Sequence, residues 1–294
     1  MILRVIGVLW LAATLAFFAL RLLPGDAITA QLVDSGASAA QIESRRAALG
    51  LDAPLFTQYT DWLVGVVSGD LGVSMLDGQP VNEIVARQVA PTISLALAAL
   101  LVAILGGMTL GCAAGLGSSS ARFALNIALS APIYWTGTLA IWVFALLLDW
   151  LPSSGDSGLT GLILPSAVLG FHTAGAIGRV IAAGVAETVN ADFVFTARSK
   201  GLPEGLIVWR HILRASLLPA VSVIALQAGF LLGGVVITET LFNRPGIGRV
   251  LLDAVMRQDY PVVQGIVVWT AAVYIIVNAA ADVITRQLDP RVAA

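Results

Sequence analysis

Seven ionisable side chains lie in one stretch, Ala191–Pro219, of a chain that is 58% hydrophobic and only 12% charged. Lys200 in this stretch is the only lysine of the sequence, and Gly201 and Pro203 interrupt the chain just after it. Such side chains form ion pairs and hydrogen bonds with water, with a partner or with one another. The ionisable residues of the stretch are Asp192, Arg198, Lys200, Glu204, Arg210, His211 and Arg214.

Residue types that carry catalysis or bind metals are scarce. The one cysteine, Cys112, lies in an apolar run, which excludes an intramolecular disulfide and a cysteine-cluster metal site. The two histidines, His172 and His211, are not spaced like metal ligands. There is no G-x-x-x-x-G-K-[ST] phosphate-binding loop. We therefore expect no catalytic, metal or cofactor site in this chain.

Long apolar runs, together with a mean hydropathy of +0.90, indicate a membrane protein. Val5–Leu20, Thr92–Gly117 and Phe123–Leu148 contain no charged residue, and about 20 helical residues cross a hydrocarbon core of roughly 30 Å. Because backbone groups in lipid must be hydrogen-bonded within the segment, we expect helices. Further spans are expected near Leu162–Val185, Ser216–Val236 and Ile266–Ile284, which gives an all-α integral membrane protein with six transmembrane helices.

The pattern divides the chain into four regions. Residues 1–23 hold the first transmembrane helix; a cleaved signal peptide is the alternative, but no small-residue cleavage site follows the run. Residues 24–87 form an external segment with short helices, one over Ala39–Leu49 capped by Ser38 and an amphipathic one opened by Pro54. Residues 88–286 form a core of five helices with a loop at residues 190–215, and residues 287–294 form a C-terminal tail.

The distribution of charge predicts the orientation. With six spans and both termini in the cytoplasm, the inner side carries nine basic and four acidic residues, a net charge of +5. The outer side then carries seven basic and twelve acidic residues, a net charge of −5. Basic residues favour the cytoplasmic side, so the stretch around Lys200 is expected inside. The loop after the fifth span dissents, because it holds Arg244, Arg249 and Arg257.

Within the charged stretch the sequence predicts two short helices. The first runs from Asp192 to Lys200 and stops at Gly201, which tolerates left-handed backbone angles. Pro203 then suits the start of a second helix, Glu204–Arg214. One side of that helix would carry Leu206, Trp209, Ile212 and Leu213. By composition alone this is a solvated loop that sets topology.

The stretch "DFVFTARSKGLPEGLIVWRHILRASLLP" resembles the cytoplasmic loop of permease subunits of bacterial binding-protein-dependent ABC importers, in their dipeptide, oligopeptide and nickel branch. The general pattern there is Glu-Ala-Ala, three residues, Gly and a later Leu-Pro. Here Phe195, Thr196 and Ala197 stand first, so only the second alanine is kept, while Gly201 is in place. "RLLPGD" (Arg21–Asp26), "LGLDAPLFTQYTDWLVGVVSGDLGVS" (Leu49–Ser74), "FNRPGIGRVLLDAVMRQDYPVVQG" (Phe242–Gly265) and "LDPR" (Leu288–Arg291) are also similar to this branch.

The resemblance implies a type I ABC importer permease fold in the bacterial inner membrane, with a loop that docks on a separate ATPase subunit. Apolar loop residues would contact the ATPase and basic ones would set the register. The implied partners are a second homologous permease, two ATPase subunits that carry ATP and Mg, an external substrate-binding protein and membrane lipid, with no nucleic acid. The implied coupling residues are Phe195, Ala197, Arg198, Lys200, Gly201, Leu202, Pro203 and Glu204, with Ala197 expected in the contact face.

Four residues in or near spans are candidates for the translocation path. Glu239 is ionisable and near hydrocarbon, but a wetted helix end is the alternative. His172 is the only histidine within a span, and a packing role is the alternative. Gly229 and Gly233 permit close helix approach, either along a path or in tight packing.

The resemblance favours di- and oligopeptides as substrates, with nickel or another metal chelate as the alternative within the branch. Nickel would favour histidine or acidic ligands along the path, where only His172 is available. A gradient-driven secondary transporter is an alternative of another class, but it needs coupling residues at the membrane midplane, which this sequence hardly has. A signalling or assembly factor of the membrane is a third.

Overall fold

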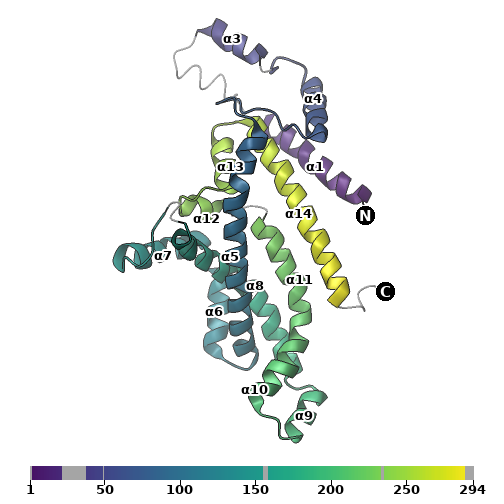
Figure 1. Cartoon of the computed structure of the whole chain (residues 1–294), viewed down its shortest axis with the longest axis vertical. Coiled ribbons are helices and arrows are strands. Elements are labelled where there is room, and N and C mark those ends of the chain that lie inside the picture. Colours follow the sequence, from purple (N-terminus) through teal and green to yellow (C-terminus); the bar gives the residue numbers. More distant parts are fainter. Residues whose placement is uncertain (1, 22–37, 49, 155–157, 233–234, 289–294) are drawn as a thin grey trace. The chain divides into compact units, whose positions relative to one another are not determined.

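The computed structural model describes residues 2–21, 38–48, 50–154, 158–232 and 235–288. These residues form helices and, apart from an isolated bridge between Val73 and Pro80, no strand (Figure 1). The prediction of an all-α chain is confirmed. The chain divides into two compact units, Met1–Pro91 with Pro245–Val273, and Thr92–Arg244 with Tyr274–Ala294.

The first unit contains the predicted external helices. Ser38 and Gln41 form a capping box at the start of α3, because the Ser38 amide donates to Gln41 Oε1 (2.8 Å) and the Gln41 amide donates to Ser38 Oγ (3.4 Å). Helix α4 ends at Gly69, whose φ is +84°. The elements of this unit are α1 (Ile2–Arg21), α3 (Ala39–Ala48), α4 (Leu55–Ser68), α13 (Ile247–Met256) and parts of α5 (Val81–Gly115) and α14 (Tyr260–Leu288).

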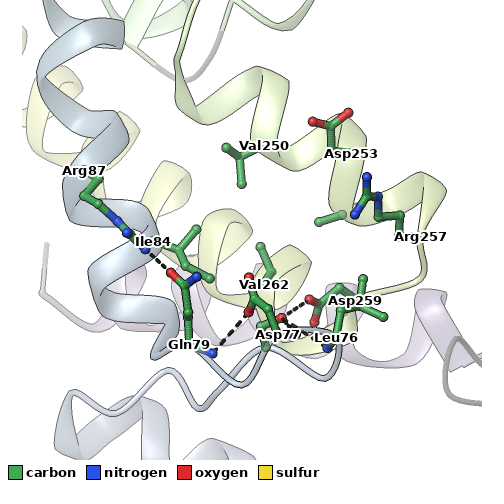
Figure 2. Close-up of a pocket in the computed structure, with 12 residues that line it drawn as sticks. Leu76, Asp77, Gln79, Ile84, Arg87, Val250, Asp253, Arg257, Asp259 and Val262 are labelled. Atoms are coloured by element: carbon green, nitrogen blue, oxygen red, sulfur yellow. Dashed lines mark hydrogen bonds between the residues drawn. The ribbon is translucent and has the colours of Figure 1, made fainter. Parts of the chain in front are cut away.

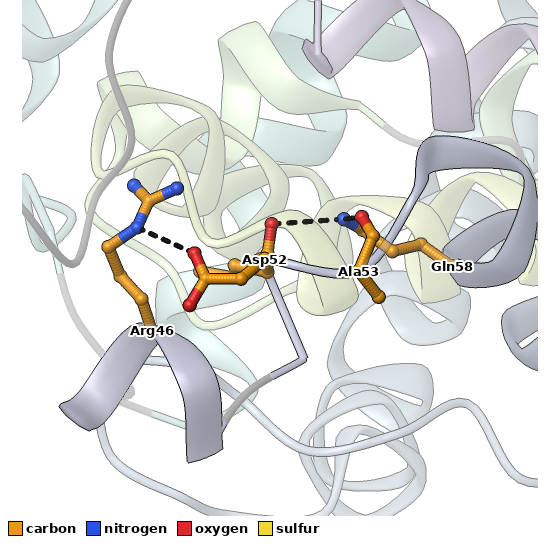
Figure 3. A network of polar contacts seen from close by, with 5 residues as sticks. Arg46, Asp52, Ala53 and Gln58 are labelled. Atoms are coloured by element: carbon orange, nitrogen blue, oxygen red, sulfur yellow. Dashed lines mark hydrogen bonds and ion pairs between the residues drawn. The ribbon is translucent and has the colours of Figure 1, made fainter. Parts of the chain in front are cut away.

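A polar network fixes the connection between α3 and α4 (Figure 3). Arg46 forms an ion pair with Asp52 (3.3 Å), and the Gln58 amide donates to the carbonyl oxygen of Ala53 (2.8 Å). The other end of the Gln58 side chain accepts from Arg21 Nη2 at 3.0 Å. Gln58 therefore ties the end of α1 to α4 while it satisfies the backbone that leads into α4.

The second unit holds most of the apolar helices. Its elements are the rest of α5 and α14, α6 (Ser119–Ser130), α7 (Ile133–Ala140), the π-helix η1 (Ile141–Leu147), α8 (Thr160–Thr188), α9 (Asp192–Ser199), α10 (Glu204–Ile207), the π-helix η2 (Val208–Ile212), α11 (Leu213–Leu232) and α12 (Val236–Leu241). Helices α5 and α8 meet along a row of glycines. A Cβ atom on Gly111 would lie 2.6 Å from the carbonyl oxygen of Gly178, and one on Gly115 would lie 2.6 Å from Val185 Cβ. Such close packing of small residues is how helices associate in lipid.

By length and composition, four helices of the described residues can cross a membrane: Val81–Gly115, Thr160–Thr188, Glu204–Leu232 and Tyr260–Ala280. The pair Ser119–Ser130 and Ile133–Leu147 counts as a fifth if the two are one broken span. The described apolar helix Ile6–Arg21 is shorter.

Two of the predicted spans need correction. The run Phe123–Leu148 is not one straight helix, because the chain bends by 109° between α6 and α7, where Ala131 and Pro132 have extended backbone angles. The fifth span does not begin at Ser216, since the helix runs on from Glu204 to Leu232. The second helix of the charged stretch is therefore the first part of this long helix.

Candidate functional site

The charged stretch folds as two helices joined by a tight turn at Gly201, as predicted. The φ angle of Gly201 is +73°, a value that costs a residue with a side chain roughly 1–2 kcal/mol. The Gly201 amide donates to the carbonyl oxygen of Arg198 (2.9 Å) and ends α9. Pro203 then precedes α10 without needing a hydrogen-bond acceptor.

An ion pair closes the turn from the outside. Arg198 Nε donates to Glu204 Oε1 at 2.8 Å, so the end of α9 is joined to the start of α10. Both side chains are exposed, and such pairs contribute about 0–1 kcal/mol. The pair therefore joins the ends of the two helices with little gain in stability.

The inner side of the turn packs on the apolar helices. Val194 and Ala197 on α9 share a buried cluster with Ile207, Ile212 and residues of α8. The expectation that Ala197 lies in a contact face is wrong, because only 5% of its surface is exposed. Ala197 instead holds α9 against the rest of the chain.

The four apolar residues predicted on one side of the second helix separate in the structure. Ile212 and Leu213 are buried together with Ile207, whereas Leu206 and Trp209 are exposed. The cause is η2, because in a π-helix the hydrogen bonds span five residues rather than four. Ile207 and Ile212, which are five residues apart, therefore face the same side.

Large apolar side chains remain exposed on these helices. Phe195 is 73% exposed and Trp209 is 70% exposed, and Phe193 and Leu206 are also exposed. Lys200 and Pro203 are exposed beside them, and Leu202 is half-buried. Exposed aromatic side chains are enriched in contacts between proteins, so these residues are candidates for such a contact.

The two polar candidates for a path, Glu239 and His172, both form hydrogen bonds that join helices. Glu239, for which a wetted helix end was the alternative, is fully buried on α12 and accepts a hydrogen bond from Thr92 Oγ1 on α5 at 2.6 Å. Glu239 therefore links α12 to α5 in the interior of the second unit.

His172 on α8 holds both sides of the bend between α6 and α7. Pro132 has no N–H group, so the carbonyl oxygen of Ala128, four residues earlier, lacks its helical donor. His172 Nδ1–H donates to that oxygen at 2.8 Å. The other ring nitrogen, Nε2, lies 2.6 Å from Thr136 Oγ1 on α7 and accepts a hydrogen bond from that hydroxyl group in this tautomer. These contacts agree with the alternative interpretation of His172, a role in helix packing.

A second proline is treated in the same way. Pro165 lies inside α8 and leaves the carbonyl oxygen of Gly161 without a donor. Arg244, which is buried, donates to that oxygen from Nη1 at 2.9 Å. Nothing in the sequence indicates this contact, because 83 residues separate Arg244 from Gly161.

Comparison with known proteins decides the family. A family model described as "Binding-protein-dependent transport system inner membrane component" matches residues 103–294, and the model of the N-terminal part of such components matches residues 1–96. This chain belongs to that family. The resemblance of the charged stretch to an ABC importer permease is confirmed, and the gradient-driven and non-transport alternatives are replaced by it.

Curated relatives cover almost the whole permease. The glutathione transport system permease protein GsiC of Escherichia coli O6:H1 is 36% identical over 297 residues, which is 99% of this chain and 96% of the relative. The proteins of the same name from Escherichia coli K12 and Salmonella typhimurium LT2 are each 35% identical over the same shares. The chain is thus a multi-pass permease of the inner membrane.

A pocket of about 360 Å³ lies in the second unit of the permease. Its lining includes Phe230 of α11 and is apolar except for Gln227 of α11, Thr173 of α8 and Thr238 of α12. Gly229 beside it is buried, and a Cβ there would lie 3.3 Å from Tyr274, which supports tight packing. Gly233 lies outside the described residues. Sequence reasoning missed Gln227, although it is the only side chain with a carboxamide in α11.

Replacing His172 should destabilise the permease through the bend. His172→Phe keeps an aromatic ring but leaves the Ala128 carbonyl oxygen without a donor, which should cost about 1–3 kcal/mol of unfolding free energy. Thr136→Val should also lower stability, whereas Thr138→Val is its matched control, because in the described part of the chain the Thr138 hydroxyl bonds only to Tyr134 of its own helix. Thermal unfolding in detergent, followed by tryptophan fluorescence, measures all three. Equal melting temperatures for His172→Phe and wild type would contradict this account of the bend.

Proposed function

We propose that this permease forms half of the path of an ATP-driven importer for short peptides and peptide-like solutes. The observation that carries the proposal is similarity over 99% of the chain to permeases named for glutathione transport. These names also leave the nickel alternative without support. A second homologous permease would form the other half of the path, and an external binding protein would deliver the solute.

In this proposal ATP and Mg bind to two separate ATPase subunits. The permease would contact them through the exposed side chains of its charged stretch, chiefly Phe195 and Trp209.

The charged stretch lies on the cytoplasmic side, as do both termini, in agreement with the excess of basic residues predicted there. A cysteine at Gln258 in a Cys112→Ser background should then react with an impermeant maleimide from outside, and one at Glu204 should not; the reverse pattern would refute this orientation.

Transport by the reconstituted complex tests the function. Proteoliposomes that hold the permease, its partner permease, the ATPases and the binding protein should take up glutathione or tri-alanine only with ATP. Nickel ions should not be taken up, and they serve as the solute control. Uptake of nickel without uptake of either peptide would overturn the assignment of substrate, and uptake of peptide without ATP would overturn the energy source.

The turn at Gly201 should be needed for coupling. Gly201→Val places a β-branched residue at a φ of +73° and should tilt α9 against α10, at a cost of about 1–2 kcal/mol or more. We expect ATP-dependent uptake to be lost and ATPase subunits to be retained less well, while the binding protein still docks. Gly205→Val is the matched control, because Gly205 has a negative φ and no neighbouring atoms within 4 Å of a new Cβ.

The exposed aromatic residues give the same test without backbone strain. Trp209→Ala should weaken ATPase binding about 30-fold, as truncation of an interface anchor does, and should leave thermal stability unchanged. Phe56→Ala on α4 removes an equally exposed aromatic residue outside the stretch and should have no effect. If both Gly201→Val and Trp209→Ala retain the ATPase and transport normally, the stretch sets topology only.

A further inference from the structure

A pocket of about 530 Å³ lies within the first unit (Figure 2). Its walls are the turn formed by residues 74–79, the first turns of α5, helix α13 and the start of α14. All of these residues belong to the segments that the proposed orientation places outside. The volume is in the range of pockets that bind small molecules.

A buried carboxylate makes this pocket a fixed feature of the chain. Asp259, at the start of α14, accepts hydrogen bonds from Ser74 Oγ (2.5 Å) and from the amide of Met75 (3.1 Å). Ser74 Oγ in turn accepts from the amide of Leu76 at 3.2 Å. The turn is therefore held against α14, and Asp259 is occupied in holding it.

Groups of both charges remain available around the pocket. Asp253 lies on α13 and Arg257 directly follows the end of that helix, and among the residues that the structure describes neither side chain forms a hydrogen bond or an ion pair. Arg87 stands on the α5 side, where it donates to Gln79, and Asp77 projects from the turn (Figure 2). The rest of the pocket lining is mostly apolar and includes Val250, Ile84 and Val262.

This arrangement suits a ligand that carries both charges. An arginine guanidinium binds a carboxylate through two parallel hydrogen bonds, and a carboxylate binds an ammonium group. A simple anion would be repelled by Asp253, and a simple cation would be repelled by Arg257. A zwitterion with an apolar middle matches the acidic group, the basic group and the apolar lining.

We propose that this outer pocket binds the free ends of a short peptide, with Arg257 at the peptide carboxylate and Asp253 at its ammonium group. The inference rests on the proposed function, since it concerns the same class of substrate, and on the orientation proposed above. The pocket would hold a peptide released by the binding protein before the peptide enters the path.

Peptides with blocked ends test the assignment of each residue. The probe is radiolabelled tri-alanine, compared with its N-acetylated form and its C-terminal amide, in equilibrium dialysis against the permease complex in lipid nanodiscs without binding protein. Arg257→Gln should weaken binding of tri-alanine about tenfold and leave binding of the amide unchanged. Asp253→Asn should weaken binding of tri-alanine and leave binding of the acetylated form unchanged.

The two variants control for each other, because a folding defect would weaken all three peptides equally. Asp61→Asn on α4 removes an exposed carboxylate that does not line the pocket, and it should bind all three peptides as wild type does. The proposal is overturned if wild type shows no saturable binding, or if the variants lose all three peptides alike. It is also overturned if they lose only the binding protein, because the pocket would then be a docking surface.

Uptake distinguishes this failure from a failure of the proposed function. Where proteoliposomes with binding protein take up tri-alanine but the variants bind the three peptides as wild type does, the peptide importer stands and the pocket assignment falls. Where wild-type proteoliposomes take up no peptide, both fall together.

Discussion

The need to pair every backbone carbonyl group inside an apolar environment shapes much of this permease. In hydrocarbon an unpaired carbonyl oxygen costs several kcal/mol, so helices dominate and each break in a helix needs a donor from elsewhere. Pro132 and Pro165 each free one carbonyl oxygen, and His172 and Arg244 each supply a donor to it. The bend between α6 and α7 is therefore held by a side chain of another helix, α8.

Hydrogen bonds inside the chain also occupy three ionisable groups of the second unit. His172 and Arg244 bond to backbone oxygens, and Glu239 bonds to Thr92. Groups committed in this way maintain structure and are poorly placed to carry a coupling ion.

The charged stretch continues into a candidate membrane span without a break in the helix. Helix α10, η2 and α11 form one continuous element from Glu204 to Leu232, and a helix transmits displacement along its axis better than a flexible linker. Val194 and Ala197 fasten α9 to the same cluster that holds Ile207 and Ile212. Trp209 thus lies on the same continuous helix as a candidate span.

The sequence alone determined the features that depend on neighbours along the chain. The apolar runs specify helices, Ser38 caps α3, and Gly201 followed by Pro203 specifies the turn between α9 and α10, because each of these depends on residues within a few positions. The resemblance to importer permeases likewise came from local motifs. Only the tertiary structure decided which face of the second helix is buried, because the π-helix at Val208–Ile212 changes the period that sequence patterns assume. It also decided that Glu239 is enclosed, that Asp259 fixes the turn at Ser74, and that His172 reaches the carbonyl oxygen freed by Pro132. A proline shows in the sequence that a carbonyl oxygen loses its donor, but which distant side chain replaces the donor depends on how the helices pack.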